Sequence, residues 1–188
     1  MMRKPLMLVA MAVPALAGCR ALDPAPEPLS SPTVAAVEEA VRFHVHLGAG
    51  QQLATKVSSP DLCPGLDIRL DLGRGKWVRM VAFAVDCEPR GGDNRQPGNG
   101  NHGLYRSAGD IPADRQTGTV ATPLGVATTF EQPYYECTNS CRHFTEPVAV
   151  IALDKPAHPR VTALTVYSEQ GTLDLDGLRA LIRDQLSP

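Results

Sequence analysis

The sequence has few aromatic residues, little net charge and no long apolar run, and the last two of these shortages each exclude a class of protein. Of 188 residues, one is tryptophan, four are tyrosine and four are phenylalanine. The 18 basic and 20 acidic residues leave a formal net charge of −2, which gives no positive surplus for binding nucleic acid or anionic lipid. No apolar run reaches the about 20 residues that a transmembrane helix needs. The composition is still 43% hydrophobic, which suits a globular core and is too apolar for a disordered chain.

Catalytic and cofactor motifs are missing as well. The sequence contains no G-x-S-x-G, no S-x-x-K, no H-E-x-x-H and no dinucleotide fingerprint. Ser168 and Glu169 follow an expected strand, but no base is recognisable beside them in the sequence. The residues therefore assign no catalytic group and no cofactor, and they favour a non-catalytic protein that binds a ligand or a partner.

The first nineteen residues have the three parts of a secretory signal peptide. Arg3 and Lys4 form a short basic start, an apolar stretch runs from Leu6 to Leu16, and small residues precede a break. The break reads Leu16-Ala17-Gly18-Cys19, which resembles the lipobox of bacterial lipoproteins at all four positions. The resemblance implies that the Cys19 thiol receives a diacylglycerol, that the chain is cut before Cys19, and that the new amino group is acylated, for example with palmitate. An ordinary signal peptide with a chance cysteine at its boundary is the alternative.

This resemblance implies a location and a partner. The expected location is the cell membrane, where the protein is lipid-anchored and faces the extracytoplasmic side of the cell envelope, and the expected partner is the lipid bilayer, reached through acylated Cys19. The chain then divides into a signal peptide (1–18), a proline-rich tether (19–32) and one globular domain (33–188). Without residues 1–18 the formal charge is −4.

Four cysteines remain after Cys19. Because an exported chain with an even number of cysteines is typical of disulfide-bonded proteins, we expect two disulfide bonds, and the favoured pairs are Cys63–Cys87 and Cys137–Cys141. The second pair closes the short loop Cys137-Thr-Asn-Ser-Cys141, whose Asn139 and Ser140 suit a turn. A metal site made of Cys137, Cys141 and His143 is the alternative, but it lacks a clear fourth ligand.

The hydrophobic pattern predicts an α+β fold: a mainly antiparallel sheet, stapled by disulfides, with a C-terminal amphipathic helix packed on it. Strict alternation over 66–72, an apolar run over 77–85 and further apolar runs over 147–153 and 161–167 predict strands. Leu175, Leu178, Leu181, Ile182 and Leu186 follow the helical period. The Thr- and Val-rich segment 118–130 is either two short strands or one bent edge strand, because Pro123 fits poorly inside a sheet.

Two further segments carry functional hypotheses. The Gly-rich stretch 89–110 has no apolar period and is expected to be a mobile loop. His44 and His46 have a spacing found in metal sites, and together with His143 they support an alternative function as a metal-binding envelope protein. An envelope hydrolase whose site is not recognisable from sequence is the other alternative.

Overall fold

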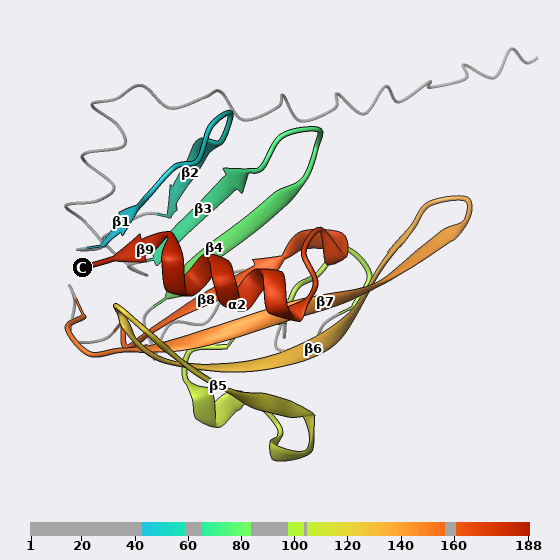
Figure 1. Ribbon diagram of the computed structural model, residues 1–188. Helices are drawn as coiled ribbons and strands as arrows, with labels where there is room; N and C mark the ends of the chain where they lie inside the picture. Colours follow the sequence, from blue (N-terminus) through green and yellow to red (C-terminus); the bar gives the residue numbers. More distant parts are fainter. Residues whose placement is uncertain (1–42, 59–64, 84–97, 104, 157–160) are drawn as a thin grey trace, which may run out of the picture.

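The structure, a computed structural model of the 188-residue chain, describes residues 43–58, 65–83, 98–103, 105–156 and 161–188 (Figure 1). Seven strands form one antiparallel sheet in the order β2-β3-β4-β8-β7-β6-β5, and the short strands β1 and β9 pair separately. The strands are β1 (His44–Val45), β2 (Gln52–Ser58), β3 (Gly65–Asp71), β4 (Trp77–Phe83), β5 (Gln116–Thr122), β6 (Gly125–Cys137), β7 (Cys141–Leu153), β8 (Ala163–Ser168) and β9 (Leu186–Ser187). The helices are η1 (Ala108–Asp110), η2 (Ala113–Arg115), η3 (Glu169–Gly171) and α2 (Leu175–Asp184). The α+β fold class expected from the sequence is confirmed.

Strands β3 and β4 form where the sequence alternates or is continuously apolar. Ile68 and Leu70 of β3 are fully buried and lie opposite Met80 and Val78 of β4. β4 lies between β3 and β8; Val78, Met80 and Ala82 face one core and Val81 faces the other, while Arg79 on the second face pairs with Asp67 of β3. The turn between β3 and β4 places Gly73, Arg74 and Gly75 at positive φ angles of 88°, 59° and 72°.

The segment 118–130 is divided between two strands by a two-residue turn at Pro123 and Leu124, as in the first of the two expectations, but the second strand is not short, since β6 continues to Cys137. Gly125 begins β6 with a φ of 141°. A Cβ atom at Gly125 would lie 1.9 Å from the carbonyl oxygen of Ala152 on β7. Only glycine permits this close approach of the two backbones.

Helix α2 lies in front of the sheet and covers one of its faces (Figure 1). Its first turn is capped by Asp174, whose Oδ1 atom accepts a hydrogen bond from the Gly177 N–H at 2.8 Å. Leu178, Leu181 and Ile182 are buried against the sheet. The helix ends at Asp184, so Leu186, which follows the helical period in sequence, lies instead in β9.

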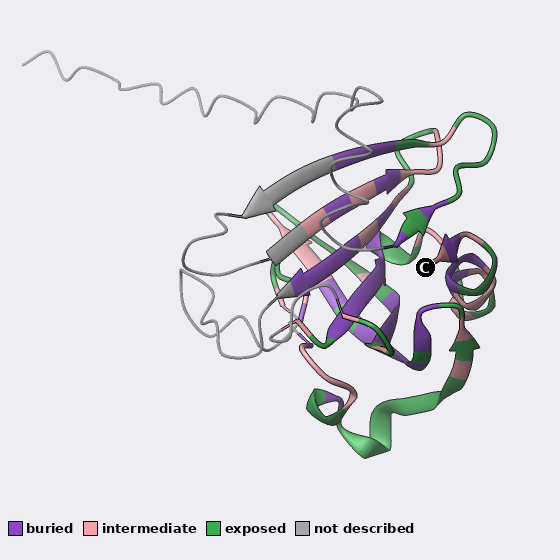
Figure 2. Ribbon diagram, turned by 90° about the vertical axis from the view of Figure 1, so that its left-hand side faces the viewer, coloured by how far each residue is buried: buried purple, intermediate pink, exposed green. Residues whose placement is uncertain are grey.

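The other face of the sheet has a second, smaller core. Tyr105 and Ile111 pack there with Phe130, Val150 and Tyr167. The expected loop over 89–110 is described at 98–103 and from Tyr105 onward, and in those parts it lies against the sheet. Figure 2 shows that the inner strands are largely buried, whereas β5 is largely exposed.

Several expectations lie outside the described residues. They are the signal peptide, Cys19, the tether, and the pair Cys63–Cys87. The second expected disulfide is present: the Sγ atoms of Cys137 and Cys141 are 2.03 Å apart, and these two residues lie directly opposite each other in the sheet register.

Candidate functional site

Strands β6 and β7 extend well beyond their neighbours and form a two-stranded arm, residues 131–147 (Figure 1). β5 pairs with β6 only as far as Phe130, and β8 pairs with β7 only from Val148 onward. The seven residue pairs from Glu131–Pro147 to Cys137–Cys141 continue past the sheet. At about 3.4 Å per residue, the arm extends roughly 20 Å.

The arm is held at its tip and along both edges. At the tip, the Cys137–Cys141 disulfide closes the hairpin. Along the β6 edge, the Gly100 N–H donates to the Tyr135 carbonyl at 2.9 Å, and the Asn99 side-chain oxygen accepts from the Cys137 N–H at 2.8 Å. Along the β7 edge, the Gln170 backbone N–H donates to the Glu146 carboxylate at 2.7 Å, and the Gly171 backbone lies close to the Thr145 carbonyl oxygen. These contacts hold the arm in one position relative to the sheet.

The two faces of the arm differ in chemistry. One face, here called the open face, carries Glu131 at its base and, from there to the tip, no further residue of Asp, Glu, Lys or Arg type. Its members are Pro133, Tyr135, Cys137, Cys141, His143 and Thr145. The rings of Tyr135 and His143 lie side by side, with their centroids 5.7 Å apart. Pro133, His143 and Thr145 are exposed, so α2 does not cover this face.

The opposite face of the arm leads into a buried polar cluster around Glu146. The Glu146 carboxylate is 0% exposed and accepts three hydrogen bonds. The donors are His102 Nδ1 at 2.9 Å, Gln132 Nε2 at 3.1 Å and the backbone N–H of Gln170 at 2.7 Å. Because an ionised carboxylate only accepts, the proton of this contact belongs to the His102 ring.

His102 is enclosed by aromatic rings and by a second carboxylate. Its ring stacks on Tyr134 with centroids 4.7 Å apart and planes 3° from parallel. Its Nε2 atom lies 3.9 Å from Glu169 Oε1, which is too far for a hydrogen bond. That carboxylate is held by Arg69, whose Nε and Nη2 atoms lie 3.1 Å and 3.0 Å from Oε1.

The cluster contains two members of a reactive site: a histidine and the carboxylate that orients it. A carboxylate that orients a histidine is half of the arrangement that activates a nucleophile. Within the described residues, however, the group facing His102 Nε2 is the Glu169 carboxylate, and no hydroxyl or thiol is hydrogen-bonded to that atom. Arg69 already supplies a positive charge beside Glu169, so a cation there would be repelled. The arrangement is suited to clamping three segments together.

The metal ligands proposed from sequence do not assemble. His46 Nε2 lies 2.9 Å from the Ser187 hydroxyl on β9, and His44 belongs to the same β1–β9 pair. His143 is on the arm, and Cys137 and Cys141 are joined to each other. In the part of the chain that the structure describes, no group of three or more His, Cys, Asp or Glu side chains is arranged to hold a metal ion.

Sequence reasoning considered Ser168 and Glu169 but did not predict that Glu169 lies beside His102 and Glu146, because the three residues are far apart in the chain. One signal was available for Glu146. The alternation of β7 places it on the same face as the buried residues Val148 and Val150. A charged residue at a position that the strand pattern assigns to a buried face calls for hydrogen-bonding partners.

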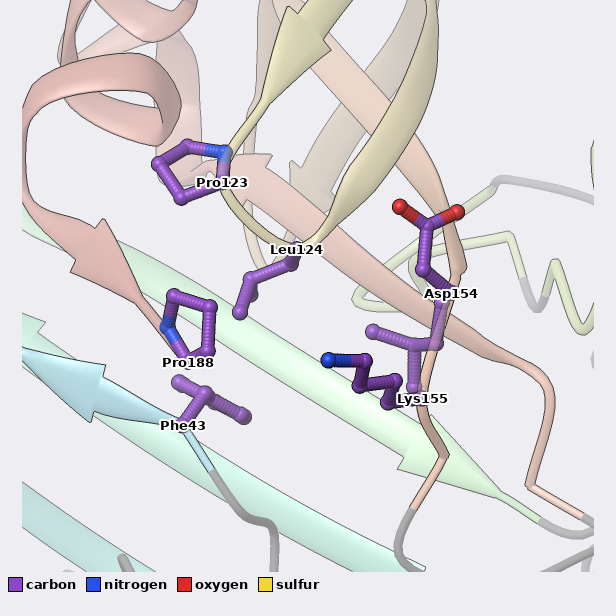
Figure 3. A pocket seen from close by; sticks show the side chains of 7 residues that line it. Phe43, Pro123, Leu124, Asp154, Lys155 and Pro188 are labelled. Carbon is purple, nitrogen blue, oxygen red and sulfur yellow. The ribbon is translucent and has the colours of Figure 1, made fainter.

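A small cavity lies at the end of the sheet opposite the arm tip (Figure 3). Its volume is about 140 Å³, and it is lined by Phe43, Pro123, Leu124, Leu153, Asp154, Lys155 and Pro188. Pockets for drug-sized ligands measure about 300–1,000 Å³, so this cavity holds only a few atoms.

Comparison with protein-family models, with curated proteins and with solved structures gives no match for this chain. No helix among the described residues is long and apolar enough to span a bilayer.

The burial of Glu146 leads to a first prediction. Glu146→Gln places an amide N–H₂ against donors that need an acceptor, which costs about 2–4 kcal/mol in the free energy of unfolding. Urea titration measures this loss. The matched control is Glu131→Gln, an exposed position on the same arm, which changes stability by less than about 0.5 kcal/mol. Equal losses of stability in the two variants would show that the hydrogen bonds of Glu146 do not hold the three segments together.

Tyr134 gives a second prediction, on alkaline pH. Burial, a hydrogen bond to Glu136 and the charges of Glu136, Glu146 and Glu169 raise the pKa of Tyr134 to about 12. An unfolded tyrosine ionises near pH 10. The stability contributed by this phenol is therefore complete below pH 10 and is lost between pH 10 and pH 12.

The expected result is a free energy of unfolding that falls over this pH range. In Tyr134→Phe the fall is smaller by up to about 2 kcal/mol, with the difference between the two proteins at pH 8 taken as the reference. Denaturant titrations at pH 8 to 12 measure it. A variant with the same pH slope as the parent would show that this phenol is not responsible.

Proposed function

We propose that this protein is a lipoprotein of the cell envelope, held at the extracytoplasmic side of the membrane by fatty chains on Cys19. Its folded domain is non-catalytic and binds a partner protein through the open face of the arm. The lipobox at Leu16–Cys19 supports the anchor, and the geometry of the arm supports the binding role.

The observation that carries the proposal is the Cys137–Cys141 disulfide at the tip of the arm. Cys141 is exposed, so the bond is open to the redox conditions around it. Disulfides of this kind persist in oxidising compartments outside the cytoplasm and are rare where thiols are kept reduced. Two independent features, the leader and the disulfide, therefore agree on export.

A binding role fits the polar cluster better than catalysis does. All three donors around Glu146 are used within the fold, and the His102 side chain is only 9% exposed. The hydrogen-bonded His102–Glu146 pair also favours a second candidate, an envelope hydrolase with His102 as its base. That candidate needs a substrate or a nucleophile at Nε2, where Glu169 lies.

A protein partner fits the open face better than a small molecule does. The cavity at the other end of the sheet holds only a few atoms, whereas the open face is a projecting surface whose outer part, from Pro133 to the tip, has no side chain of Asp, Glu, Lys or Arg type. Aromatic residues such as Tyr135 are frequent among the residues that dominate binding energy. A surface that is already fixed by a disulfide and two braced edges loses little conformational entropy on binding.

The anchor predicts the behaviour of Cys19→Ser. Without the thiol no diacylglycerol can be attached, so the protein moves from the membrane fraction to the soluble fraction of the cell. Fractionation followed by immunoblotting measures the distribution, and mass spectrometry of the parent protein measures the mass added at Cys19. A variant that pellets with membranes as the parent does would overturn the anchor.

The binding role predicts a position-dependent crosslink. A photoreactive amino acid in place of Tyr135 should give, in living cells, one adduct of defined mass with another envelope protein. The same group in place of exposed Thr162, which lies outside the arm, should give none. The identified protein, once purified, should bind the parent at least about tenfold more tightly than Tyr135→Ala. If adducts formed equally well from both positions, the partner would not bind specifically through the open face of the arm.

A further inference from the structure

Strand β5 forms one edge of the sheet, and most of it lacks the features that usually prevent a free strand edge from pairing with another strand. It is the outermost strand after β6, and its seven residues, Gln116–Thr122, include no charged side chain and no proline. The opposite edge strand, β2, includes Lys56. Natural proteins generally block free strand edges with charged residues, prolines or bulges, because an unblocked edge pairs with another strand.

Only the first part of β5 has such protection. The sheet register shifts between Gln116 and Gly118, which marks a bulge. The Arg179 side chain from α2 reaches this bulge, where its Nη2 atom lies 3.3 Å from the Thr117 carbonyl oxygen. From Gly118 to Thr122 the pairing with β6 is regular. Arg179 Nη2 lies beside Gly118, 3.5 Å from where a Cβ atom there would be, so the stretch Thr119–Thr122 is the part of the edge beyond this contact.

The free edge has a defined set of backbone groups. Thr122 and Gly125 flank the two-residue turn, so alternation along an antiparallel pair directs the N–H and C=O groups of Thr119 and Ala121 away from β6. No strand among the described residues pairs with this side. Val126, directly opposite Ala121, is 53% exposed, so the sheet surface beside the edge is also apolar.

We propose that β5 pairs with β5 of a second copy of this chain, antiparallel and with Val120 on the two-fold axis. In this register Thr119 of each copy lies opposite Ala121 of the other, so that their outward N–H and C=O groups form hydrogen bonds across the axis. Val120 lies opposite its own equivalent, and no like charges meet. The two sheets become one continuous sheet with an isologous interface.

The charges at the ends of the strand fit the same register. Arg115 immediately precedes β5, and the symmetry places it near the turn Pro123–Leu124 of the other copy. Asp154 lies beside that turn, since its backbone N–H donates to the Leu124 carbonyl at 2.9 Å. Both charged residues are exposed. Arg115 and Asp154 therefore attract each other at both ends of the paired strands, and the exposed neighbours Asp114 and Lys155 bring a second pair of opposite charges to the same places.

A single strand pair buries less surface than a standard stable interface, so the dimer should form at micromolar concentrations. The test uses the full chain purified in a mild nonionic detergent, with masses from light scattering corrected for bound detergent. The parent should change from monomer to dimer as its concentration rises. A parent that is monomeric at every concentration up to its solubility limit would overturn the proposal.

Two sets of variants test the surface and the register. Thr119→Lys with Ala121→Lys should raise the dimer Kd at least about tenfold, whereas Gln52→Lys with Thr162→Lys adds the same charge at exposed positions elsewhere and should leave it unchanged. Arg115→Asp should weaken the dimer, and Arg115→Asp combined with Asp154→Arg should restore it. Thermal melting confirms that each variant is folded. Equal dimer affinity in the edge variant and its control, or no restoration by the charge exchange, would refute pairing through β5.

Discussion

The arrangement around the arm depends on one buried charge, the carboxylate of Glu146. A carboxylate without partners in a protein interior costs several kcal/mol, so it must be surrounded by donors before the strand that carries it can be buried. The three donors come from three different parts of the chain: His102 from the segment before β5, Gln132 from β6 and the backbone of Gln170 from η3. A single requirement thus fixes the base of the arm, the covering segment and the connection into α2.

This requirement also explains an unusual backbone conformation. Gln170 adopts φ 54° and ψ 27°, a left-handed conformation that is uncommon outside glycine. In that conformation its N–H reaches Glu146, and its side-chain amide reaches Glu136 Oε1 at 2.8 Å. The two hydrogen bonds offset the local strain.

Local pattern was enough to predict much of the fold from sequence. The alternation over Leu66–Leu72, the apolar run after Trp77 and the helical spacing of Leu178 and Ile182 each depend on which face of one element is buried, and such patterns are visible within a short window. The Cys137–Cys141 pair was predictable for the same reason, since only three residues lie between the two cysteines. The length of the arm was not, because it depends on where β5 and β8 stop pairing.

The polar cluster was not predictable because its members are distant in sequence. His102 and Glu146 are 44 residues apart, and nothing in a single sequence indicates that the two meet. His44, His46 and His143 attracted attention through their local spacing or a nearby cysteine pair, yet the described structure does not group them as metal ligands. Local spacing detects sites built on one element, and this cluster is built from four.

The pairing of β1 with β9 has a mechanical consequence. Phe43, where the described domain begins, lines the small cavity together with Pro123 and Leu124 of the β5–β6 turn. That turn is at the end of β6 opposite Cys137. Phe43 therefore lies at the end of the domain remote from the hairpin tip. In the lipid-anchored protein that we propose, the full length of β6 and β7 would separate this end from the tip.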